Sequence, residues 1–351
     1  MNVLSLFDGS SCGQVALQRA GIHVDNYFAS EIDKYAIKVT QANFPNTIQL
    51  GDVRDVITTS SESKYEPTFY EGDIDLLMGG SPCQGFSFAG HQLNFDDPRS
   101  KLFFEFTRIM YDIKPKYVLL ENVRMAKKSQ DVISKYMGFE PQPLNSKYVS
   151  AQNRYRLYWF GKLSQLGTSY EEVTIPPMIC KGLSMQDILE DGYATDEMTS
   201  QDGKSHCLTA RYNGAVWWNS IERKQRTMVL KDNPTMSKDG LIRVGTADLK
   251  GHDSIKRVYA QEGKAPTLTT MQGGHREPKV ATSKDMWRKL TPLECERLQT
   301  LPDNYTNHVS NSQRYKMIGN GWTVDVIAHI LKGIHLDGWN EMYNNNNKEY
   351  V

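Results

Sequence analysis

Apolar residues recur along the first half of the chain with two different periods. Short continuous apolar runs, typical of buried strands, occupy residues 3–7, 26–30, 74–78 and 117–120. Apolar residues at helical spacing occupy the intervening segments 13–19, 34–43 and 102–113. Strands that alternate with helices predict an α/β fold, a parallel sheet covered by helices. Ligands of such sheets bind beyond the carboxyl ends of the strands.

The pattern changes after Gly161. Residues 176–284 form polar, glycine-broken segments with few helical periods, which predicts a smaller, β-rich lobe. Within it, the segment 204–214 resembles the segment 264–274. Two similar loops on one face would suit a recognition surface, and chance similarity explains them equally well.

Helical patterning returns near the C-terminal end. Thr291, Pro292 and Glu294 form a capping box with proline at the first helical position, which predicts a helix over 291–299. A Gly-Asn-Gly sequence at 319–321 breaks the next helix. Thr323 can cap a final helix, whose apolar stripe consists of Val324, Ile327, Ala328 and Leu331.

These patterns predict a discontinuous domain organisation. We expect residues 1–175 and 318–340 to form one larger domain. Residues 176–317 would form a smaller lobe with its hinge helices, and residues 341–351 a polar tail.

Composition narrows the class of protein. No apolar run reaches the length of about 18 residues that a membrane span needs, and residues 1–21 look like strand, turn and helix rather than a signal peptide, so we expect a cytoplasmic protein. The five cysteines form no CxxC pair, which argues against disulfides and a metal site. Formal net charge is zero, which still permits a basic cleft, although surface arginines are ordinarily only solvated.

Candidate catalytic groups follow three of the predicted strands. Cys83 lies in the Gly-Gly-Ser-Pro-Cys-Gln-Gly loop directly after the strand 74–78, and Glu121 ends the strand after 117–120. Arg154 and Arg156 alternate at strand period, so they would point to one face. Their charge would favour the thiolate form of Cys83. A lone cysteine is otherwise most often a small buried apolar residue.

These blocks, in this order, resemble the DNA (cytosine-5) methyltransferase family. The resemblance spans residues 1–161 and 287–331 and rests on six blocks. They are the Phe-Asp-Gly loop at 7–13, the Pro-Cys loop, Glu-Asn-Val at 121–123, Gln-x-Arg-x-Arg at 152–156, the 288–303 block and Gly-Asn-Gly at 319–321. The resemblance implies a Rossmann-like S-adenosylmethionine-dependent methyltransferase domain with a smaller, β-rich target-recognition lobe.

The same resemblance implies a reaction. A methyl group would pass from S-adenosylmethionine to C5 of a flipped-out cytosine in double-stranded DNA, leaving S-adenosyl-L-homocysteine, through a covalent bond between Cys83 and C6. Glu121 would act as an acid at N3 and the exocyclic amine. Arg156 would hold O2 of the base, and Arg154 would support the thiol, Glu121 and a nearby phosphate.

Cofactor-binding residues are carried over in the same way. Glu31 would hold the ribose hydroxyls, Asp52 would accept from the adenine amine, and four apolar side chains would sandwich adenine. The complete predicted set is Phe7, Asp8, Gly9, Gly13, Glu31, Ile32, Asp52, Val53, Leu102, Asn320 and Trp322.

DNA-contacting residues are predicted in two places. Gln84 and Ser87 belong to a loop at 84–95 that would close over the flipped base. Arg211, Gln272 and Arg276 lie in or beside the two similar loops and would read base edges. We expect the protein to act as a monomer on double-stranded DNA, in a bacterial or phage setting, and to associate with the nucleoid through that DNA.

Three alternatives remain at this point. One is a transfer-RNA cytosine-5 methyltransferase of the same fold, against which the long middle lobe argues. Another is a catalytically inactive DNA-binding relative, although every catalytic residue is present. The last is a nicotinamide-dependent enzyme, but no GxGxxG follows the first strand.

Overall fold

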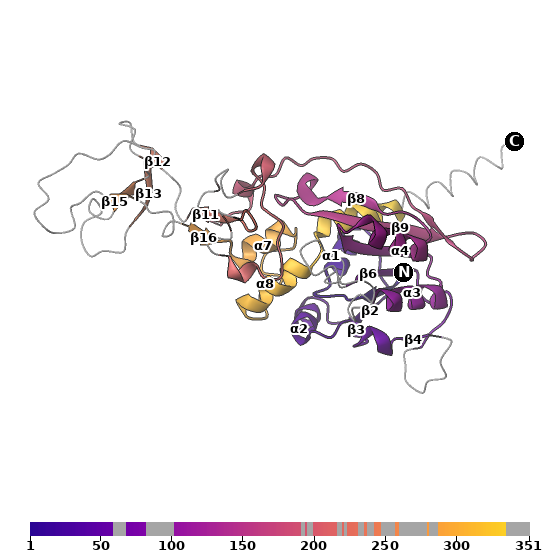
Figure 1. The fold of residues 1–351 in the computed structure, drawn as a ribbon. Helices are drawn as coiled ribbons and strands as arrows, with labels where there is room; N and C mark the ends of the chain where they lie inside the picture. Colours follow the sequence, from indigo (N-terminus) through magenta and orange to yellow (C-terminus); the bar gives the residue numbers. More distant parts are fainter. Residues whose placement is uncertain are drawn as a thin grey trace, which may run out of the picture.

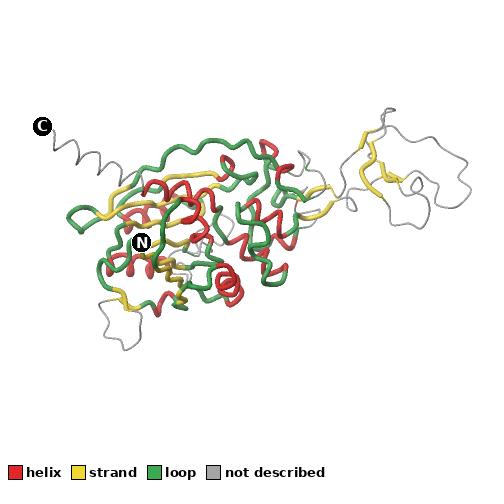
Figure 2. Tube along the Cα trace, turned by 180° about the vertical axis from the view of Figure 1, so that it is seen from behind, coloured by secondary structure: helices red, strands yellow, loops and turns green. Residues whose placement is uncertain are grey.

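A computed structural model provides the structure of the chain. It describes residues 1–58, 68–81, 102–190, 194, 199–215, 220, 223–230, 235–236, 242–246, 257–259, 279–280 and 287–334. Figure 1 shows a large body built around one sheet, with smaller β elements at one end, and Figure 2 shows the same arrangement from behind.

The largest sheet has eight strands. They are β1 (Asn2–Leu6), β2 (Asn26–Ser30), β3 (Ile48–Gln49), β6 (Leu76–Gly80), β7 (Tyr117–Val123), β8 (Gln142–Asn145), β9 (Tyr155–Leu163) and β10 (Tyr170–Glu172). The spatial order is β10-β9-β7-β6-β1-β2-β3, and β8 pairs with β9. From β7 to β3 the strands are parallel, as predicted.

The predicted all-parallel arrangement is wrong at one edge. There β9 runs antiparallel to β7, and β8 and β10 run antiparallel to β9. Between β7 and β9 the chain forms α4 and then β8. Since β8 runs in the same direction as β7, the chain enters β9 at the end of the sheet where β7 finishes, and β9 runs the opposite way. The sheet is therefore mixed, which is common where an open parallel sheet ends.

Local sequence explains where the covering helices begin and end. The helices of this part are α1 (Cys12–Ala20), α2 (Lys34–Asn43), α3 (Leu102–Ile113) and α4 (Lys127–Met137). The side chain of Asp33 caps α2 by accepting from the Tyr35 N–H at 2.9 Å. Gly21 and Gly138 end α1 and α4 in the left-handed region, which glycine adopts without strain.

Each face of the sheet has its own apolar core. On one face, α1 and the final helix over 324–334 cover Val3, Met78 and Leu119. On the other, α3 and α4 cover alternate residues of the same strands, such as Leu4 and Leu77. The predicted stripe of the final helix, Val324, Ile327, Ala328 and Leu331, is buried, which confirms that interpretation.

Among the described residues, the remaining elements form a third core and three small sheets, β11–β16, β12–β15 and β4–β5. Its helices, α7 (Pro292–Leu298) and α8 (Asn311–Asn320), lie next to each other between the large sheet and the pair β11–β16 (Figure 1). The predicted capping box of α7 is present, with Thr291 accepting from the Glu294 N–H. The other strands are β4 (Ile57–Thr58), β5 (Thr68–Phe69), β11 (Met228–Leu230), β12 (Thr235–Met236), β13 (Ile242–Thr246), β14 (Arg257–Tyr259), β15 (Lys279–Val280) and β16 (Trp287–Lys289).

Short 3₁₀ turns link several of these elements. They are η1 (Val53–Asp55), η2 (Ser146–Tyr148), η3 (Met185–Asp187), η4 (Gln201–Gly203) and η5 (Tyr212–Gly214). Among the described helices, none is long and apolar enough to cross a membrane.

Candidate active site at the carboxyl ends of the strands

The strand order reverses between β1 and β6, which predicts a ligand crevice at the carboxyl ends of these strands. The chain runs from β1 outward to β2 and β3, then returns to β6 and β7 on the other side. Such a topological switch point is where open α/β sheets bind ligands. Most candidate cofactor residues follow β1, β2 and β3, whereas Leu102 begins α3 and Asn320 ends α8. Of the candidate catalytic residues within the described part of the chain, Glu121 lies in β7, Arg156 in β9 and Arg154 just before β9.

The loop after β1 has an unusual backbone. Phe7, Gly9 and Ser11 all have positive φ, between 56° and 60°. Two of these residues are not glycine, and the left-handed region is unfavourable for them. Such backbone conformations persist where the surroundings enforce them, and they cluster at ligand sites.

Glu31 fixes this loop to the end of β2. Its Oε2 accepts from the Gly9 N–H at 2.8 Å, and its Oε1 accepts from the N–H groups of Ile32 and Asp33, both at 2.8 Å. These contacts hold the carboxylate in one orientation at the mouth of the crevice. Glu31 and Gly9, two predicted cofactor residues, are therefore in direct contact.

Asp8 is a buried acid behind the same loop. Its oxygens accept from the Tyr27 hydroxyl at 2.7 Å and from the Ser11 hydroxyl. Burial raises the pKa of Asp8 to about 6, although the hydrogen bonds from Ser11 and Tyr27 act in the opposite direction. Both contacts are with neighbouring residues, so Asp8 stabilises the loop after β1.

Gly13 packs closely against two side chains of the sheet. A Cβ at this position would lie 2.4 Å from Met78 Cε and 3.0 Å from the Tyr27 hydroxyl. A larger residue would therefore require the flexible end of the Met78 side chain to move. Gly13, which is predicted to belong to the cofactor loop, therefore also allows α1 to lie close to the sheet.

Apolar candidates for the adenine site fall into two groups. Phe7, Val53 and Leu102 belong to one apolar cluster, in which Phe7 and Leu102 are only partly buried. Ile32 is 72% exposed. An exposed isoleucine beside Glu31 leaves apolar surface that a flat ligand could cover.

Asp52 is already paired. Its carboxylate accepts from Arg54 Nε at 2.9 Å and from Arg54 Nη2 at 2.5 Å, and it also caps η1. The hydrogen bond from the Arg54 side chain holds the pKa of Asp52 below its ordinary value. Its predicted contact with an adenine amine would share this carboxylate with Arg54.

The catalytic end of the crevice contains a nearly buried ion pair. Glu121 Oε1 lies 3.0 Å from Arg156 Nε, and Glu121 is 9% exposed. The Nε–H makes no hydrogen bond, so the two charges touch without a directed bond between them. Arg156 Nη1 donates to the Tyr155 carbonyl at 2.8 Å.

Gly80 makes room for this pair at the end of β6. A Cβ on Gly80 would lie 3.1 Å from Glu121 Oε2 and 3.0 Å from Trp322 Nε1. Gly80 is also the strand partner of Glu121. Next along the chain, the Ser81 hydroxyl accepts from Asn122 Nδ2 at 3.1 Å, which links β6 to β7.

Arg154 is more deeply buried than Arg156, at 5% exposed. Its Nη1 donates to the carbonyls of Leu208 at 3.0 Å and Gly319 at 3.4 Å, and its Nη2 donates to the Gly321 carbonyl at 2.9 Å. One guanidinium therefore joins the start of β9, the 205–208 segment and the 319–321 loop.

Cys207 is a site residue that the sequence analysis did not single out. Its Sγ lies 3.5 Å from Arg154 Nη1 and 3.7 Å from Arg156 Nη2. The contact of both arginines with one sulfur confirms that Arg154 and Arg156 point to the same face. The available signal was indirect, since Cys207 belongs to the first of the two similar loops.

Buried glutamines hold the same region together. Gln152 Nε2 donates to Gln299 Oε1 at 3.2 Å, and Gln299 Nε2 donates to the Ile318 and Gly321 carbonyls at 2.8 and 3.2 Å. Thr323 donates to Gln299 at 2.8 Å. The conspicuous blocks at 152–156, 288–303 and 319–321 thus meet in one polar network.

Several predicted residues lie outside the described residues. They are Cys83, Gln84, Ser87, Gln272 and Arg276. Of the other candidates, Arg211 is exposed at the start of η5, and Asn320 is exposed at the end of α8.

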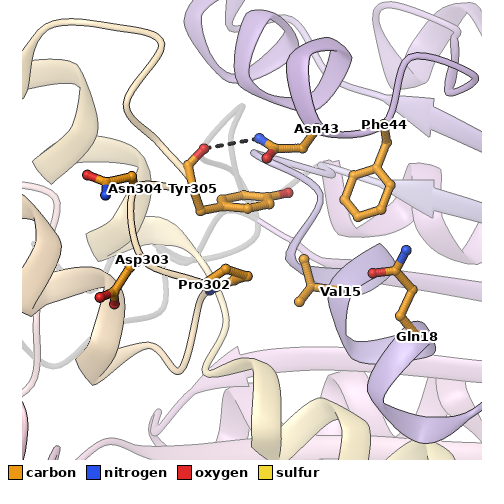
Figure 3. Close-up of a pocket in the computed structure, with 8 residues that line it drawn as sticks. All are labelled: Val15, Gln18, Asn43, Phe44, Pro302, Asp303, Asn304 and Tyr305. Atoms are coloured by element: carbon orange, nitrogen blue, oxygen red, sulfur yellow. Dashed lines mark hydrogen bonds between the residues drawn. The ribbon is translucent and has the colours of Figure 1, made fainter.

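A separate cavity of about 250 Å³ opens between α1, α2 and the turn after α7 (Figure 3). It is lined by Val15, Gln18, Asn43, Phe44, Pro302, Asp303, Asn304 and Tyr305. None of the predicted site residues lines it. It touches the cofactor loop through Tyr305, whose hydroxyl donates to the Ser10 carbonyl at 2.6 Å.

Comparison with known proteins identifies the family. The model of the C-5 cytosine-specific DNA methylase family matches residues 1–335. The chain belongs to this family. Two relatives are the orphan methyltransferase M.Rho11sI of Bacillus phage rho11s, 32% identical, and the type II methyltransferase M.HhaI of Haemophilus parahaemolyticus, 28% identical. Both alignments cover 95% of this chain, and they cover 97% and 94% of the relatives.

Solved structures show the same fold. An Entamoeba histolytica methyltransferase, EhMeth, superposes with a TM-score of 0.63 at 17% identity, covering 96% of this chain and 98% of its own. A putative DNA modification methyltransferase from an Escherichia coli prophage gives 0.52 at 24% identity, covering 95% of this chain and 98% of its own.

The family assignment confirms the predicted fold and enzyme class. The chain is a DNA cytosine-5 methyltransferase, and the family methylates cytosine with S-adenosylmethionine. The nicotinamide alternative is thereby excluded, and DNA is favoured over transfer RNA. Within the described part of the chain, no group of three or more His, Cys, Asp or Glu side chains could hold a metal ion.

Proposed function

We propose that this DNA methylase transfers its methyl group through a covalent bond between Cys83 and C6 of a cytosine flipped out of the duplex. The observation that carries the proposal is the Glu121–Arg156 pair at 3.0 Å, beside Gly80 at the end of β6. It supplies a carboxyl group and a cation in one nearly buried place, beside Gly80, which precedes Cys83 by three residues. Cys83 itself lies outside the described residues.

The crevice after β1 and β2 fits S-adenosylmethionine, which supplies an electrophilic methyl group when bound. We propose that Glu31 holds the ribose hydroxyls, since its carboxylate is fixed at the mouth of the crevice. Phe7, Ile32 and Leu102 offer partly or fully exposed apolar surface for adenine. Asp52 accepts from the adenine amine, Asn320 and Trp322 contact the methionine end, and Asp8, Gly9, Gly13 and Val53 shape the loop.

The reaction begins at the pyrimidine ring. The Cys83 thiolate adds to C6, a carbon–sulfur bond forms, and the electron pair of the 5,6 double bond moves toward N3. Glu121 donates a proton or a hydrogen bond there, and Arg156 holds O2. C5 would then become electron-rich and take the methyl group, whose bond to sulfur would break to release S-adenosyl-L-homocysteine.

The second half restores the ring. A base, for which water is one candidate, takes the C5 proton, and any proton given to N3 returns to Glu121. The electron pair re-forms the 5,6 double bond, and the carbon–sulfur bond breaks to return the Cys83 thiolate. The atoms and charges balance without an oxidant or a metal ion. Arg154 acts indirectly, because its guanidinium donates to the backbone carbonyls of Leu208, Gly319 and Gly321 and so fixes the segments around the base site.

The target base must leave the helix to reach these groups, because C5 and C6 of a stacked base are not accessible. We propose that Gln84 and Ser87 belong to the loop that closes over it. Residues 1–175 with 318–340 would form the catalytic domain, and 176–317 the recognition lobe, acting as a monomer. We further propose Arg211, Gln272 and Arg276 as readers of base edges.

Trapping tests the nucleophile. Duplex DNA that contains 5-fluorocytosine should form a stable covalent complex with the wild-type protein, because fluorine cannot leave C5 as the proton does. Cys83→Ser should lose both trapping and methyl transfer while it retains binding of S-adenosylmethionine, and Cys180→Ser, at an exposed cysteine, serves as the matched control. Trapping that persists in Cys83→Ser would refute the proposal.

Site preference tests the recognition lobe. Arg211→Ala should relax or abolish methylation at the preferred sequence, since a good bidentate contact contributes about 1–3 kcal/mol of discrimination. Arg226→Ala is a fitting control, because Arg226 donates to the Gly214 carbonyl beside the same turn. Sequencing of methylated random duplexes measures the outcome, and an unaltered preference in the Arg211, Gln272 and Arg276 variants would place recognition elsewhere.

A further inference from the structure

The sulfur of Cys207 lies between the two arginines of the active site. It is 3.5 Å from Arg154 Nη1 and 3.7 Å from Arg156 Nη2. Cys207 lies outside the eight-stranded sheet, in a segment that the sequence analysis assigned to the recognition lobe.

The backbone around Cys207 is firmly attached to the sheet domain. The Ser205 N–H donates to the Ala151 carbonyl at 2.8 Å, and the Asn153 N–H donates to the Ser205 carbonyl at 2.9 Å. On the other side of Cys207, the Leu208 N–H donates to Gln152 Oε1 at 2.9 Å. Fixed backbone on both sides gives the sulfur a defined position.

Charge supports the contact. Burial raises the pKa of Cys207, whereas the guanidiniums of Arg154 and Arg156 lower it. The lowering is the larger effect, so the pKa lies below the ordinary value of a thiol. Among the described residues, Tyr158 also interacts electrostatically with Cys207, and Glu121 and Tyr158 both interact with Arg156. The sulfur therefore has more thiolate character than an ordinary cysteine and attracts both cations.

Arg156 is thus held at both ends of its guanidinium. Nη1 donates to the Tyr155 carbonyl at 2.8 Å, and Nη2 contacts Cys207. The Nε–H is left without a hydrogen bond, 3.0 Å from Glu121. Without the sulfur, Nη2 would lose a partner, and the guanidinium could rotate toward a bidentate pair with Glu121, the geometry that arginine and carboxylate prefer.

We infer that Cys207 is a positioning residue, contributed from beyond the sheet, that holds the Arg156 guanidinium at a set angle to Glu121. Both groups then remain directed at the base. This inference rests on the proposed roles of Glu121 and Arg156. The segment 205–208, which lies in the predicted recognition lobe, would then help to set the geometry of the catalytic residues.

A double-mutant cycle tests the inference on the full chain. Single-turnover methyl transfer would be measured with radiolabelled S-adenosylmethionine, unmethylated genomic DNA and enzyme in excess. Cys207→Ala should slow the transfer by roughly 10-fold to 100-fold, because a misplacement near 1 Å has effects of this order. Cys207→Ser should recover part of the rate, since its hydroxyl still accepts a hydrogen bond.

The decisive measurement is the energetic coupling between the substitutions at Cys207 and Arg156. In an Arg156→Lys background, Cys207→Ala should have little further effect, because residues that act through one another are not additive. Affinity for S-adenosylmethionine should stay unchanged in all four proteins. Cys180→Ala should match the wild type, since Cys180 is exposed. If Cys207→Ala fails to fold, the cycle is run with Cys207→Ser.

Alkylation gives an independent readout. In a Cys83→Ser protein, iodoacetamide should modify Cys207 with a half-maximal rate at lower pH than Cys180, as judged by mass spectrometry, and Arg156→Lys should raise that pH. Additive rate effects, or a wild-type rate in both Cys207 variants, would overturn the positioning role. If Glu121→Gln and Cys83→Ser also retain full rate, the proposed function fails as well. Loss of rate in those two alone refutes only the role of Cys207.

Discussion

The two ends of the crevice are built by different means. At the cofactor end, Glu31 and Asp8 hold the loop after β1 through bonds to backbone N–H groups and neighbouring hydroxyls. At the base end, charged side chains hold one another, and Arg156 retains an N–H without a hydrogen bond. In the first region backbone N–H groups hold the loop after β1, whereas in the second the Arg156 guanidinium keeps an unused donor beside Glu121.

This difference suggests a division of labour. A site held by backbone contacts is pre-organised before the ligand arrives, which limits the entropy lost on binding. A cluster of side-chain charges with an unused donor is suited to a group whose charge changes during reaction. Variants at the cofactor end should alter affinity or stability, and variants at the base end should alter rate.

The largest expected effect tests the base end. Glu121→Gln keeps the shape of the side chain but cannot supply a proton, so the single-turnover rate should fall by about 10² to 10⁴. Affinity for S-adenosylmethionine should not change. Glu105→Gln, which alters a partly exposed glutamate of α3, controls for removal of a carboxylate. Equal losses of affinity and rate in Glu121→Gln would break the comparison.

Arg154 separates structural from chemical roles within the base end. Arg154→Lys cannot reach all three carbonyls, and each unsatisfied buried acceptor costs about 1–3 kcal/mol. Urea denaturation should show a loss of about 3 kcal/mol or more, together with a lower rate. Arg124→Lys, at an exposed arginine directly after β7, should stay within about 0.5 kcal/mol of the wild type. A fully stable Arg154→Lys would contradict this role.

Asp8 gives the cofactor end a pH signature. Its pKa rises from 3.8 to about 6 on folding, so the folded state favours the protonated form. The resulting cost is absent below pH 3.8, grows between there and about pH 6, and is constant above. Asp8→Asn removes this cost of ionisation. The unfolding free energy of the Asp8→Asn variant should therefore rise by about 1–3 kcal/mol relative to that of the wild type as the pH increases across that interval. A difference that does not vary with pH would show that Asp8 titrates normally.

Tyr305 should produce the smallest change. Tyr305→Phe deletes the hydrogen bond to the Ser10 carbonyl, which is worth about 0.5–1.5 kcal/mol. Isothermal titration should therefore show S-adenosylmethionine binding weakened by no more than about tenfold, with the rate at saturation unchanged. Tyr111→Phe deletes a comparable bond to the Tyr136 carbonyl on the far side of α3 and should leave binding unaltered. A reduced saturated rate in Tyr305→Phe would link the two ends more closely than we expect.

Sequence patterns predicted the framework of the sheet domain well. The runs at 26–30 and 34–43 correspond to β2 and α2 at the same residues, and the helix at 102–113 is α3. Local signals were sufficient here, because apolar periodicity and caps are properties of neighbouring residues. The direction of β9 was not predictable in this way, because it depends on where the preceding connection leaves the chain.

The candidate site was predicted in part. Glu121 and Arg156 were chosen from motifs and lie 3.0 Å apart. The roles proposed for Asp52 and Asn320 stay predictions, as do those of Cys83, Gln272 and Arg276, which lie outside the described residues.

The sequence by itself determined the enzyme class, because its chemistry needs a fixed set of side chains in a fixed order after the strands of one sheet. Only the tertiary structure decided what surrounds them. Cys207 meets Arg154 across 53 positions of the chain, and Tyr305 meets Ser10 across 295. No periodicity or spacing encodes such contacts, since they arise when separate segments pack together and the buried polar groups of each must find partners in the other.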